Sequence, residues 1–298
     1  MPDGALRGAR TVVQVSLLGR LGNNLFQYAF GRLIAEHFQY EFRCARHVPV
    51  INPEYTEANA GATVTLEQIQ PYLPGAPLHI PGRRIVLPTQ VFDVFGINPR
   101  WRGHRVHLDR LLREPFHRAI FLRGYFQRYE YFADNRDRIR KWFALDLDSA
   151  VDFPRRTDVV LSIRRGADYA NGGWVLPMSY YTTALARLSN IGTVFVCGTC
   201  IDHRVRRALA KYHPVYCCDA PPLQQLNLMI RANRLVMANS TFAWWGAFLG
   251  SATELYAPVG SRAIYGFSGY SDVDLRIVDR AYSEIAVRKA APGAHRSL

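Results

Sequence analysis

Two adjacent arginines, Arg164 and Arg165, follow directly on a largely apolar run at residues 159–163. The run predicts a buried β-strand with the arginines at its carboxyl end, where parallel α/β sheets bind ligands. Two guanidinium groups there can bind a diphosphate and offset charge on a leaving group. Asp168, in the same turn, could act as a general base or only hold an arginine in place. A surface ion pair is the alternative explanation.

A second motif, Gly-Arg-Leu-Gly-Asn-Asn at residues 19–24, follows an apolar run at residues 11–18. Its glycines let the backbone approach a ligand closely, and the start of the helix predicted at residues 25–37 favours an anion. The spacing matches neither a dinucleotide fingerprint nor a Walker loop. A tight strand-to-helix turn without a ligand explains the motif equally well.

A third motif, Asn-Ser-Thr-Phe-Ala-Trp-Trp-Gly at residues 239–246, follows a predicted strand at residues 235–238. Ser240 or Thr241 would cap the next helix, and hydroxyl and N–H groups at that position can bind phosphate. We expect Trp244 and Trp245 in the core rather than as a platform for a sugar.

The elements that must position these motifs follow a regular rhythm from residue 159 onward. Strands alternating with helices predict βαβ crossovers and a parallel sheet. The fold class is therefore α/β, with two halves at residues 1–153 and 154–298 that face each other across a cleft. The predicted strands are 11–18, 85–87, 91–95, 119–122, 159–163, 193–196, 215–217, 235–238 and 254–257. The predicted helices are 25–37, 104–113, 129–143, 179–188 (opening on a capping Ser179), 202–211, 221–232 and 241–249, and residues 47–103 are otherwise irregular.

The net charge is +13, and only three of the 37 basic residues are lysine. Arginine suits phosphate because its planar fork bonds bidentately. Since the charge is spread along the chain, we weigh a phosphorylated small substrate above nucleic acid and leave an anionic membrane surface open.

Five cysteines, an odd number, and no apolar stretch of signal-peptide type predict reduced thiols and a cytoplasmic protein. No apolar stretch reaches the roughly 18 residues that a membrane span needs. Cys197 and Cys200 have the spacing of a redox pair, but we expect neither redox work nor a metal site with the adjacent Cys217 and Cys218. Two Asp-x-Asp pairs fall in polar connecting stretches, which favours chemistry without a metal.

In this order, four blocks resemble the α-1,2-fucosyltransferases of glycosyltransferase family 11 and, more distantly, the α-1,6- and protein O-fucosyltransferases. The blocks are Gly19 to Phe30, Leu122 to Gln127 with Tyr131-Phe132, Arg164-Arg165-Gly166 with Asp168-Tyr169, and Leu228-Met229 with Ala238 to Ala247. Together they span about residues 15–258.

The resemblance implies a GT-B-like fold with an N-terminal acceptor-side domain and a C-terminal domain that binds a nucleotide sugar. It implies inverting transfer of L-fucose from GDP-β-L-fucose to a galactose hydroxyl, with an α-1,2 linkage and no metal or other cofactor. The implied catalytic residues are Arg164 and Asp168. Those implied for the donor are Gly22, Asn23, Arg164, Arg165, Gln225, Asn239, Ser240 and Thr241, and Tyr125 and Gln127 are implied for the acceptor.

Three departures from the family pattern keep alternatives open. Ser162 replaces a histidine, Ala167 displaces Asp168 by one position, and Gln225 stands where the family carries an acid that could accept from guanine N–H groups. One alternative is transfer of a different sugar from a GDP or other nucleotide donor. The other is a non-catalytic basic relative that binds nucleotides, nucleic acid or membrane.

Overall fold

A computed structural model describes residues 11–17, 19–45, 66–79, 91–93, 112–113, 119–146, 154–171, 173–259 and 283–286. They form two compact units, the first within residues 1–67 and 77–126 and the second within 68–76 and 127–298. The break near residue 126 precedes the one expected at 153/154, because residues 127–146 pack with the second unit.

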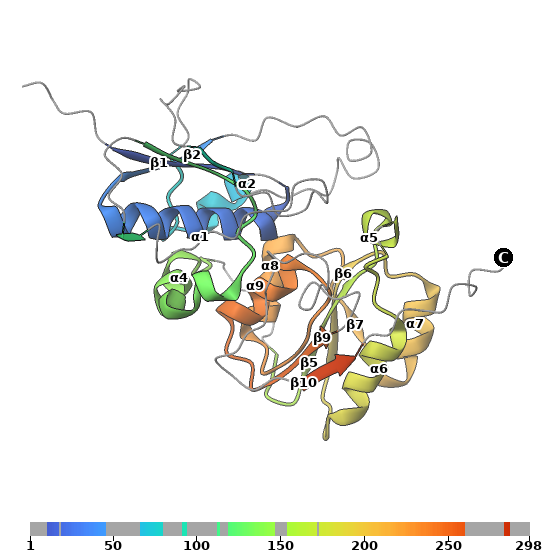
Figure 1. Cartoon of the computed structure of the whole chain (residues 1–298). Helices are drawn as coiled ribbons and strands as arrows, with labels where there is room; N and C mark the ends of the chain where they lie inside the picture. The colour runs from blue at the N-terminus through green and yellow to red at the C-terminus, as the bar shows by residue number, and fades with distance from the viewer. Residues whose placement is uncertain are drawn as a thin grey trace, which may run out of the picture. The chain divides into compact units, whose positions relative to one another are not determined.

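The first unit is a parallel sheet with strand order β2-β1-β4-β3. Its long helix α1 packs against β1 and β2 (Figure 1). Gly31 permits this close packing, because a Cβ atom there would lie 2.8 Å from the ring of Phe42 and 3.3 Å from Val15. The elements are β1 (Val12–Ser16), α1 (Leu21–Phe38), β2 (Glu41–Ala45), β3 (Val91–Asp93) and β4 (Ala119–Arg123), and the short helix α2 (Leu66–Ile69) is divided between the two units.

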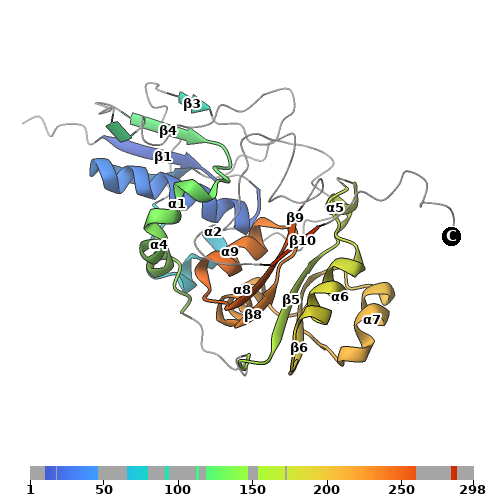
Figure 2. The ribbon, with the colours of Figure 1, turned by 60° about the horizontal axis from the view of Figure 1, so that its bottom comes forward.

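The second unit is a six-stranded parallel sheet with strand order β10-β9-β8-β5-β6-β7. Helices α6 and α7 cover one face, and α8 and α9 cover the other (Figures 1 and 2). The strands are β5 (Val159–Arg164), β6 (Val194–Thr199), β7 (Val215–Tyr216), β8 (Arg234–Val236), β9 (Glu254–Val259) and β10 (Ser283–Ala286). The helices are α4 (Arg136–Trp142), α5 (Ala167–Asn171), α6 (Met178–Arg187), α7 (His203–Leu209), α8 (Pro222–Arg231) and α9 (Thr241–Leu249).

This strand order is that of a doubly wound Rossmann fold. From β5 the chain winds through β6 and β7 toward one edge, and it then returns to β8 and winds through β9 and β10 toward the other. The order therefore reverses between β5 and β8, and such a switch point is where open α/β sheets bind ligands. The predicted α/β class with Rossmann-like halves is confirmed for each unit by itself.

Apolar packing holds the second sheet between its helix layers. Leu161 and Ile163 of β5 belong to one buried apolar cluster with side chains of α6 and α7, so the apolar positions that recur along those two helices face the sheet. On α9, Trp244 and Trp245 are fully buried and lie within aromatic contact of Phe132. The expectation that the two tryptophans belong to the core is confirmed, and neither can form an exposed sugar platform.

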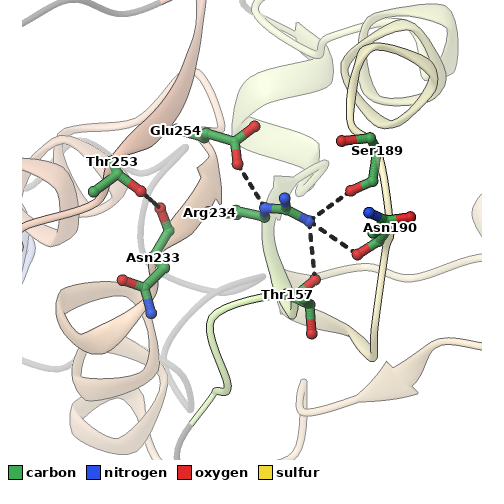
Figure 3. A network of polar contacts seen from close by, with 7 residues as sticks. All are labelled: Thr157, Ser189, Asn190, Asn233, Arg234, Thr253 and Glu254. Atoms are coloured by element: carbon green, nitrogen blue, oxygen red, sulfur yellow. Dashed lines mark hydrogen bonds and ion pairs between the residues drawn. The ribbon is translucent and has the colours of Figure 1, made fainter.

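The Arg234 side chain forms hydrogen bonds with several segments at the amino ends of the strands in the second sheet (Figure 3). Its Nε donates to Oε1 of Glu254 at 2.7 Å, and its Nη1 donates to the carbonyls of Thr157, Ser189 and Asn190 at 2.9–3.2 Å. One guanidinium group thereby joins the start of β8 to the start of β9, the segment before β5 and the turn after α6. Because this edge is opposite the carboxyl ends, the network stabilises the sheet away from the predicted site.

Two arginines of α4 bind the carboxyl end of α9. Arg136 donates to the carbonyls of Phe248 and Gly250 at 2.8 and 2.9 Å, and Arg140 donates to Leu249 at 2.7 Å and to Gly250. The last carbonyls of a helix lack partners within the helix and carry partial negative charge, so cations there are stabilising. These bonds explain why residues 127–146 belong to the second unit.

The predicted elements are largely present, with local corrections. The segment 129–143 forms two 3₁₀ turns before α4, and α6 begins at Met178 after Pro177, so the predicted cap by Ser179 is wrong. Strands β2 and β10 and helices α2 and α5 had no sequence prediction, and α2 falls in the stretch that was predicted as irregular. The predicted strand 85–87 and most of the predicted helix 104–113 lie outside the described residues. In the part of the chain that the structure describes, no helix has the length and apolar character of a membrane span.

Candidate active site

The switch point of the second unit brings two of the predicted motifs to one edge of the sheet. Arg164 is the last residue of β5, and Asn239 and Ser240 lie between β8 and α9. Since β5 and β8 are hydrogen-bonded neighbours that run parallel, both motifs emerge at the same carboxyl edge. The sequence predicted each motif at a strand end, and the strand order makes the two strands adjacent.

Arg164 is half-buried at this edge, and its side chain contacts Thr199 and Tyr169. Its Nη1 donates to Oγ1 of Thr199 at 3.3 Å, and its guanidinium carbon lies 4.9 Å from the centre of the Tyr169 ring. Arg164 and Thr199 are also paired residues in the ladder between β5 and β6. Arg165 makes a separate contact, from its Nη1 to the carbonyl of Leu176 at 3.3 Å.

The end of β5 is built from tightly packed groups. The buried Tyr181 hydroxyl interacts with the main chain of Arg164, and burial raises the pKa of this phenol well above its ordinary value. Gly198 of β6 has a φ of 132°, and a Cβ atom there would collide with the carbonyl oxygen of Ile163. A side chain at position 198 would therefore displace the strand that carries Arg164.

The amino end of α9 is capped by Ser240, whose Oγ accepts from the N–H of Ala243 at 3.1 Å. The adjacent Asn239 is buried, and its Nδ2 donates to the carbonyl of Trp174 at 3.1 Å. Thr241 is half-buried in the first turn. The start of α9 therefore combines N–H groups, a hydroxyl and the positive end of the helix dipole, which together suit an anion.

Gln225 lies on α8 and contacts the backbone of the same sheet. Its Oε1 accepts from the N–H of Gly198 at 2.8 Å, and its Nε2 donates to the carbonyls of Ala220 and Cys218 at 2.8 and 3.3 Å. The side chain is 7% exposed. It thus joins the end of β6 to the loop after β7, while its predicted contact with guanine stays a prediction.

Asp168, the predicted base, belongs to the short helix α5 directly after the arginines. Its side chain lies outside the described part of the structure, so its role also stays a prediction. Of the two predicted acceptor residues, Tyr125 is half-buried after β4 in the first unit. Gln127 is buried and begins the second unit's main segment.

In the first unit, the Gly-rich motif is mostly helical. Helix α1 begins at Leu21, earlier than predicted, so that Gly22 and Asn23 lie in its first turn and only Gly19 and Arg20 form the turn itself. Gly19 has a φ of 75°, and the side-chain amide of Asn23 occupies the place of a Cβ atom on it. The motif follows β1, whose neighbours are β2 and β4.

Asn24 of the motif and Gln27, three residues after it, have internal roles. Asn24 accepts from the N–H of Leu66 at 3.2 Å, and its Nδ2 donates to Gln27 at 3.3 Å. Gln27 in turn donates to the carbonyl of Gly124 at 2.8 Å. These buried bonds attach α1 to the end of β4.

Three of the cysteines gather near the end of β6. Cys197 is buried beside Cys217, because Val196 pairs with Tyr216 in the preceding rung of the ladder. Their thiols share a hydrogen bond, which raises the pKa of Cys197 and lowers that of Cys217 to about 7. No disulfide bond joins any two of the five cysteines, all of which the structure describes, and their reduced state stays a prediction. Among the described residues, no three His, Cys, Asp or Glu side chains form a group that could hold a metal ion.

Comparison with known proteins identifies the family. The family model described as glycosyl transferase family 11 matches residues 97–258, more than half of the chain. The protein belongs to glycosyl transferase family 11. The match includes Arg164, Gln225 and the start of α9, so the predicted glycosyltransferase class is confirmed by a segment that contains most of the candidate site.

Several solved structures are similar to this family 11 chain. They include a variant of Arabidopsis thaliana FUT1 in complex with GDP (11% identity, 86% of this chain, 72% of that chain, TM-score 0.45). The fucosyltransferase NodZ from Bradyrhizobium is also similar (15% identity, 80% of this chain, 94% of that chain, TM-score 0.43). So is a family 9 glycosyl transferase from Veillonella parvula (13% identity, 93% of this chain, 86% of that chain, TM-score 0.43). None of the curated proteins matches the sequence. Since these TM-scores are below 0.5, the family assignment rests on the sequence match alone.

Some residues of the site had no prediction from the sequence. Thr199 contacts Arg164 only because β6 pairs with β5 in this register. Trp174 reaches the site through its carbonyl, which Asn239 binds. Neither residue has a local signal in the sequence, whereas Tyr169 already belongs to one of the family blocks, where it had no assigned role.

Proposed function

We propose that this family 11 glycosyltransferase transfers L-fucose from GDP-β-L-fucose to a galactose hydroxyl, with inversion and an α-1,2 linkage. One observation carries the proposal: Arg164 and the start of α9 lie at the carboxyl edge of adjacent strands, on either side of the switch point. A diphosphate there would meet a guanidinium group and a helix amino end together. The ordered blocks that resemble the α-1,2-fucosyltransferases support the choice of fucose and GDP.

In the proposed reaction, the acceptor oxygen attacks the anomeric carbon as the bond from that carbon to the β-phosphate oxygen breaks. Asp168 would take the proton of the acceptor hydroxyl. Negative charge then develops on the departing GDP, and Arg164 would stabilise it with a charge-assisted hydrogen bond. Ser240, Thr241 and the N–H groups of α9 would hold the diphosphate, and no metal or other cofactor takes part.

The remaining predicted contacts belong to the same proposal. Arg165 and Asn239 would also contact the donor. Their side chains already bind backbone carbonyls near this edge of the sheet, those of Leu176 and Trp174. Gly22 and Asn23 stay predicted contacts of the donor, and Tyr125 and Gln127 stay predicted contacts of the acceptor.

Substitution of Arg164 tests the proposal directly. Removal of one preorganised donor to a leaving group costs roughly 100- to 1,000-fold in kcat, and we expect that loss in Arg164→Ala. Arg164→Lys should be intermediate, because an ammonium group lacks the planar fork. Arg204→Ala, at an exposed position on α7, is the matched control. GDP binding is measured by calorimetry, and turnover by the release of GDP from GDP-fucose.

A wild-type protein that neither binds GDP nor turns over GDP-fucose would refute the proposal. Undiminished turnover in Arg164→Ala would refute the role of that residue alone. A different nucleotide sugar is the second candidate, because Ser162 and Gln225 depart from the family pattern. A panel of donors in thermal unfolding separates the two, since a ligand that binds only the folded chain raises its unfolding temperature.

We also propose that the protein is cytoplasmic. We further propose that its excess of arginine lets it bind an anionic membrane surface rather than nucleic acid. Exposed cations gather on α7 and the turn after it: Arg204, Arg206, Arg207 and Lys211. Sedimentation with vesicles that contain phosphatidylserine should decrease steeply with salt, because screening weakens such contacts. Equal sedimentation with neutral vesicles, or strong salt-dependent binding to DNA, would contradict this expectation.

A further inference from the structure

The orientation of the Arg164 side chain depends on groups from two different segments. Thr199 on β6 accepts from its Nη1 at 3.3 Å, and the Tyr169 ring on α5 lies 4.9 Å from its guanidinium carbon. A cation within about 6 Å of an aromatic ring centre is attracted to the ring face. A contact of this kind restricts the orientation of a long, flexible side chain.

The Tyr169 ring is itself held in place. The N–H of Tyr169 donates to the carbonyl of Gly166, and the N–H of Trp174 donates to the carbonyl of Tyr169, both at 2.9 Å. The two aromatic rings meet edge to face, with centres 5.8 Å apart. Asn239 then binds the carbonyl of Trp174 at 3.1 Å. A continuous series of contacts thus runs from the loop after β8 to the guanidinium group at the end of β5.

We propose that Tyr169 is a positioning residue, which acts on the donor diphosphate through Arg164. The inference rests on the proposed function, because it assigns the diphosphate to Arg164. The Tyr169 ring and the Thr199 hydroxyl hold the guanidinium group in its binding orientation before the donor arrives. Asn239 contributes by anchoring the loop that carries the ring. Binding then costs less side-chain entropy than it would for an unrestrained arginine.

The ring face, rather than the phenolic hydroxyl, is the part that acts. Tyr169→Phe should therefore keep GDP affinity and kcat/KM within about threefold of wild type. Tyr169→Leu, which keeps an apolar side chain but no ring, should weaken GDP binding and lower kcat/KM by roughly 10-fold, the range expected of one partly buried cation–π contact. The matched control is Tyr212→Leu, since Lys211 lies 4.9 Å from the Tyr212 ring at the opposite, amino-terminal edge of β7.

A double-substitution cycle separates positioning from a general structural effect. In an Arg164→Ala background, Tyr169→Leu should change GDP affinity by less than about twofold, because its effect passes through the absent guanidinium group. The same roughly 10-fold loss in both backgrounds would overturn the proposal. So would equal affinity of the Phe and Leu variants for GDP.

A chemical readout decides the matter without the donor. Phenylglyoxal modifies arginine, and peptide mass spectrometry follows its reaction with Arg164. In Tyr169→Leu this reaction should be at least about threefold faster than in wild type or Tyr169→Phe, because the ring no longer covers the guanidinium group. Equal rates in the three proteins would overturn the positioning role. If the wild type binds no GDP, the proposed function fails, and the phenylglyoxal rates still test the contact.

Discussion

Gln225 provides a decisive test, because its sequence position suggests contact with guanine whereas its structural contacts are to the protein backbone. The substitution Gln225→Leu keeps the approximate size of the side chain and removes all three of its hydrogen bonds. The N–H of Gly198 and the carbonyls of Cys218 and Ala220 lose that partner at a site that is 7% exposed. At about 1 kcal/mol for each bond, the second unit should lose roughly 3 kcal/mol.

A loss of that size is measurable by thermal unfolding. At about 2–4 °C for each kcal/mol in a domain of this size, the unfolding temperature should fall by roughly 6–12 °C. Circular dichroism measures the transition, and calorimetry measures GDP binding in the same protein. Gln224 is exposed on the same helix, so Gln224→Leu is the matched control and should leave the transition nearly unchanged.

Gln225→Glu distinguishes the two roles through pH. A carboxylate could still accept from Gly198, but it would face the carbonyl oxygens of Cys218 and Ala220. Burial and those oxygens would raise the pKa of the new carboxyl above its unfolded value of about 4.3. Its favourable contribution is complete below the unfolded pKa and is lost as the pH rises through the folded pKa. The variant should therefore be clearly less stable at pH 8 than at pH 5, relative to wild type.

The opposite result would refute this reasoning. If Gln225→Glu unfolds at the wild-type temperature at pH 8 and binds GDP more tightly, the side chain faces the base rather than the backbone. Gln224→Glu again serves as the control, because an exposed carboxyl should show no comparable dependence on pH.

Three further predictions follow from single contacts. Arg234→Met should destabilise the second unit by about 2 kcal/mol in urea unfolding, because the substitution removes a partly buried ion pair and bonds to three carbonyls. Arg207→Ala, at an exposed site, is the control, and an equal loss of stability in the two variants would contradict this prediction. Arg136→Met should cost about 1 kcal/mol in the same assay, since it removes two bonds to the last carbonyls of α9 while those of Arg140 remain. An unchanged denaturation midpoint would count against this role of Arg136. Alkylation of Cys217, measured by peptide mass spectrometry, should accelerate as the pH rises through about 7, because the thiolate is the reactive form. Cys197→Ala should move the midpoint of this pH dependence upward, since the Cys197 thiol lowers the pKa of Cys217. An unmoved midpoint would show that the two thiols do not interact.

Local pattern was enough to predict much of the second unit. The helix at residues 241–249 was predicted with its correct bounds, and the prediction that Ser240 or Thr241 caps it is confirmed in Ser240. The main strands were also found, because a buried strand is a short apolar run between turns. Errors occurred where local signals compete. The start of α1 was read as a turn because of Gly22, and Ser179 was taken for a cap although Pro177 precedes the helix.

The amino-acid sequence by itself determined which residues can do chemistry and that each motif follows a strand. Periodicity reports only neighbours along the chain, so it could not show which strands pair. The tertiary structure decided that β5 lies between β6 and β8. The pairing of β5 with β6 places Thr199 beside Arg164, and the pairing of β5 with β8 places the start of α9 at the same edge of the sheet. It also decided that the Gln225 amide binds three backbone groups, because a buried amide must find partners and the end of β6 supplies one of them.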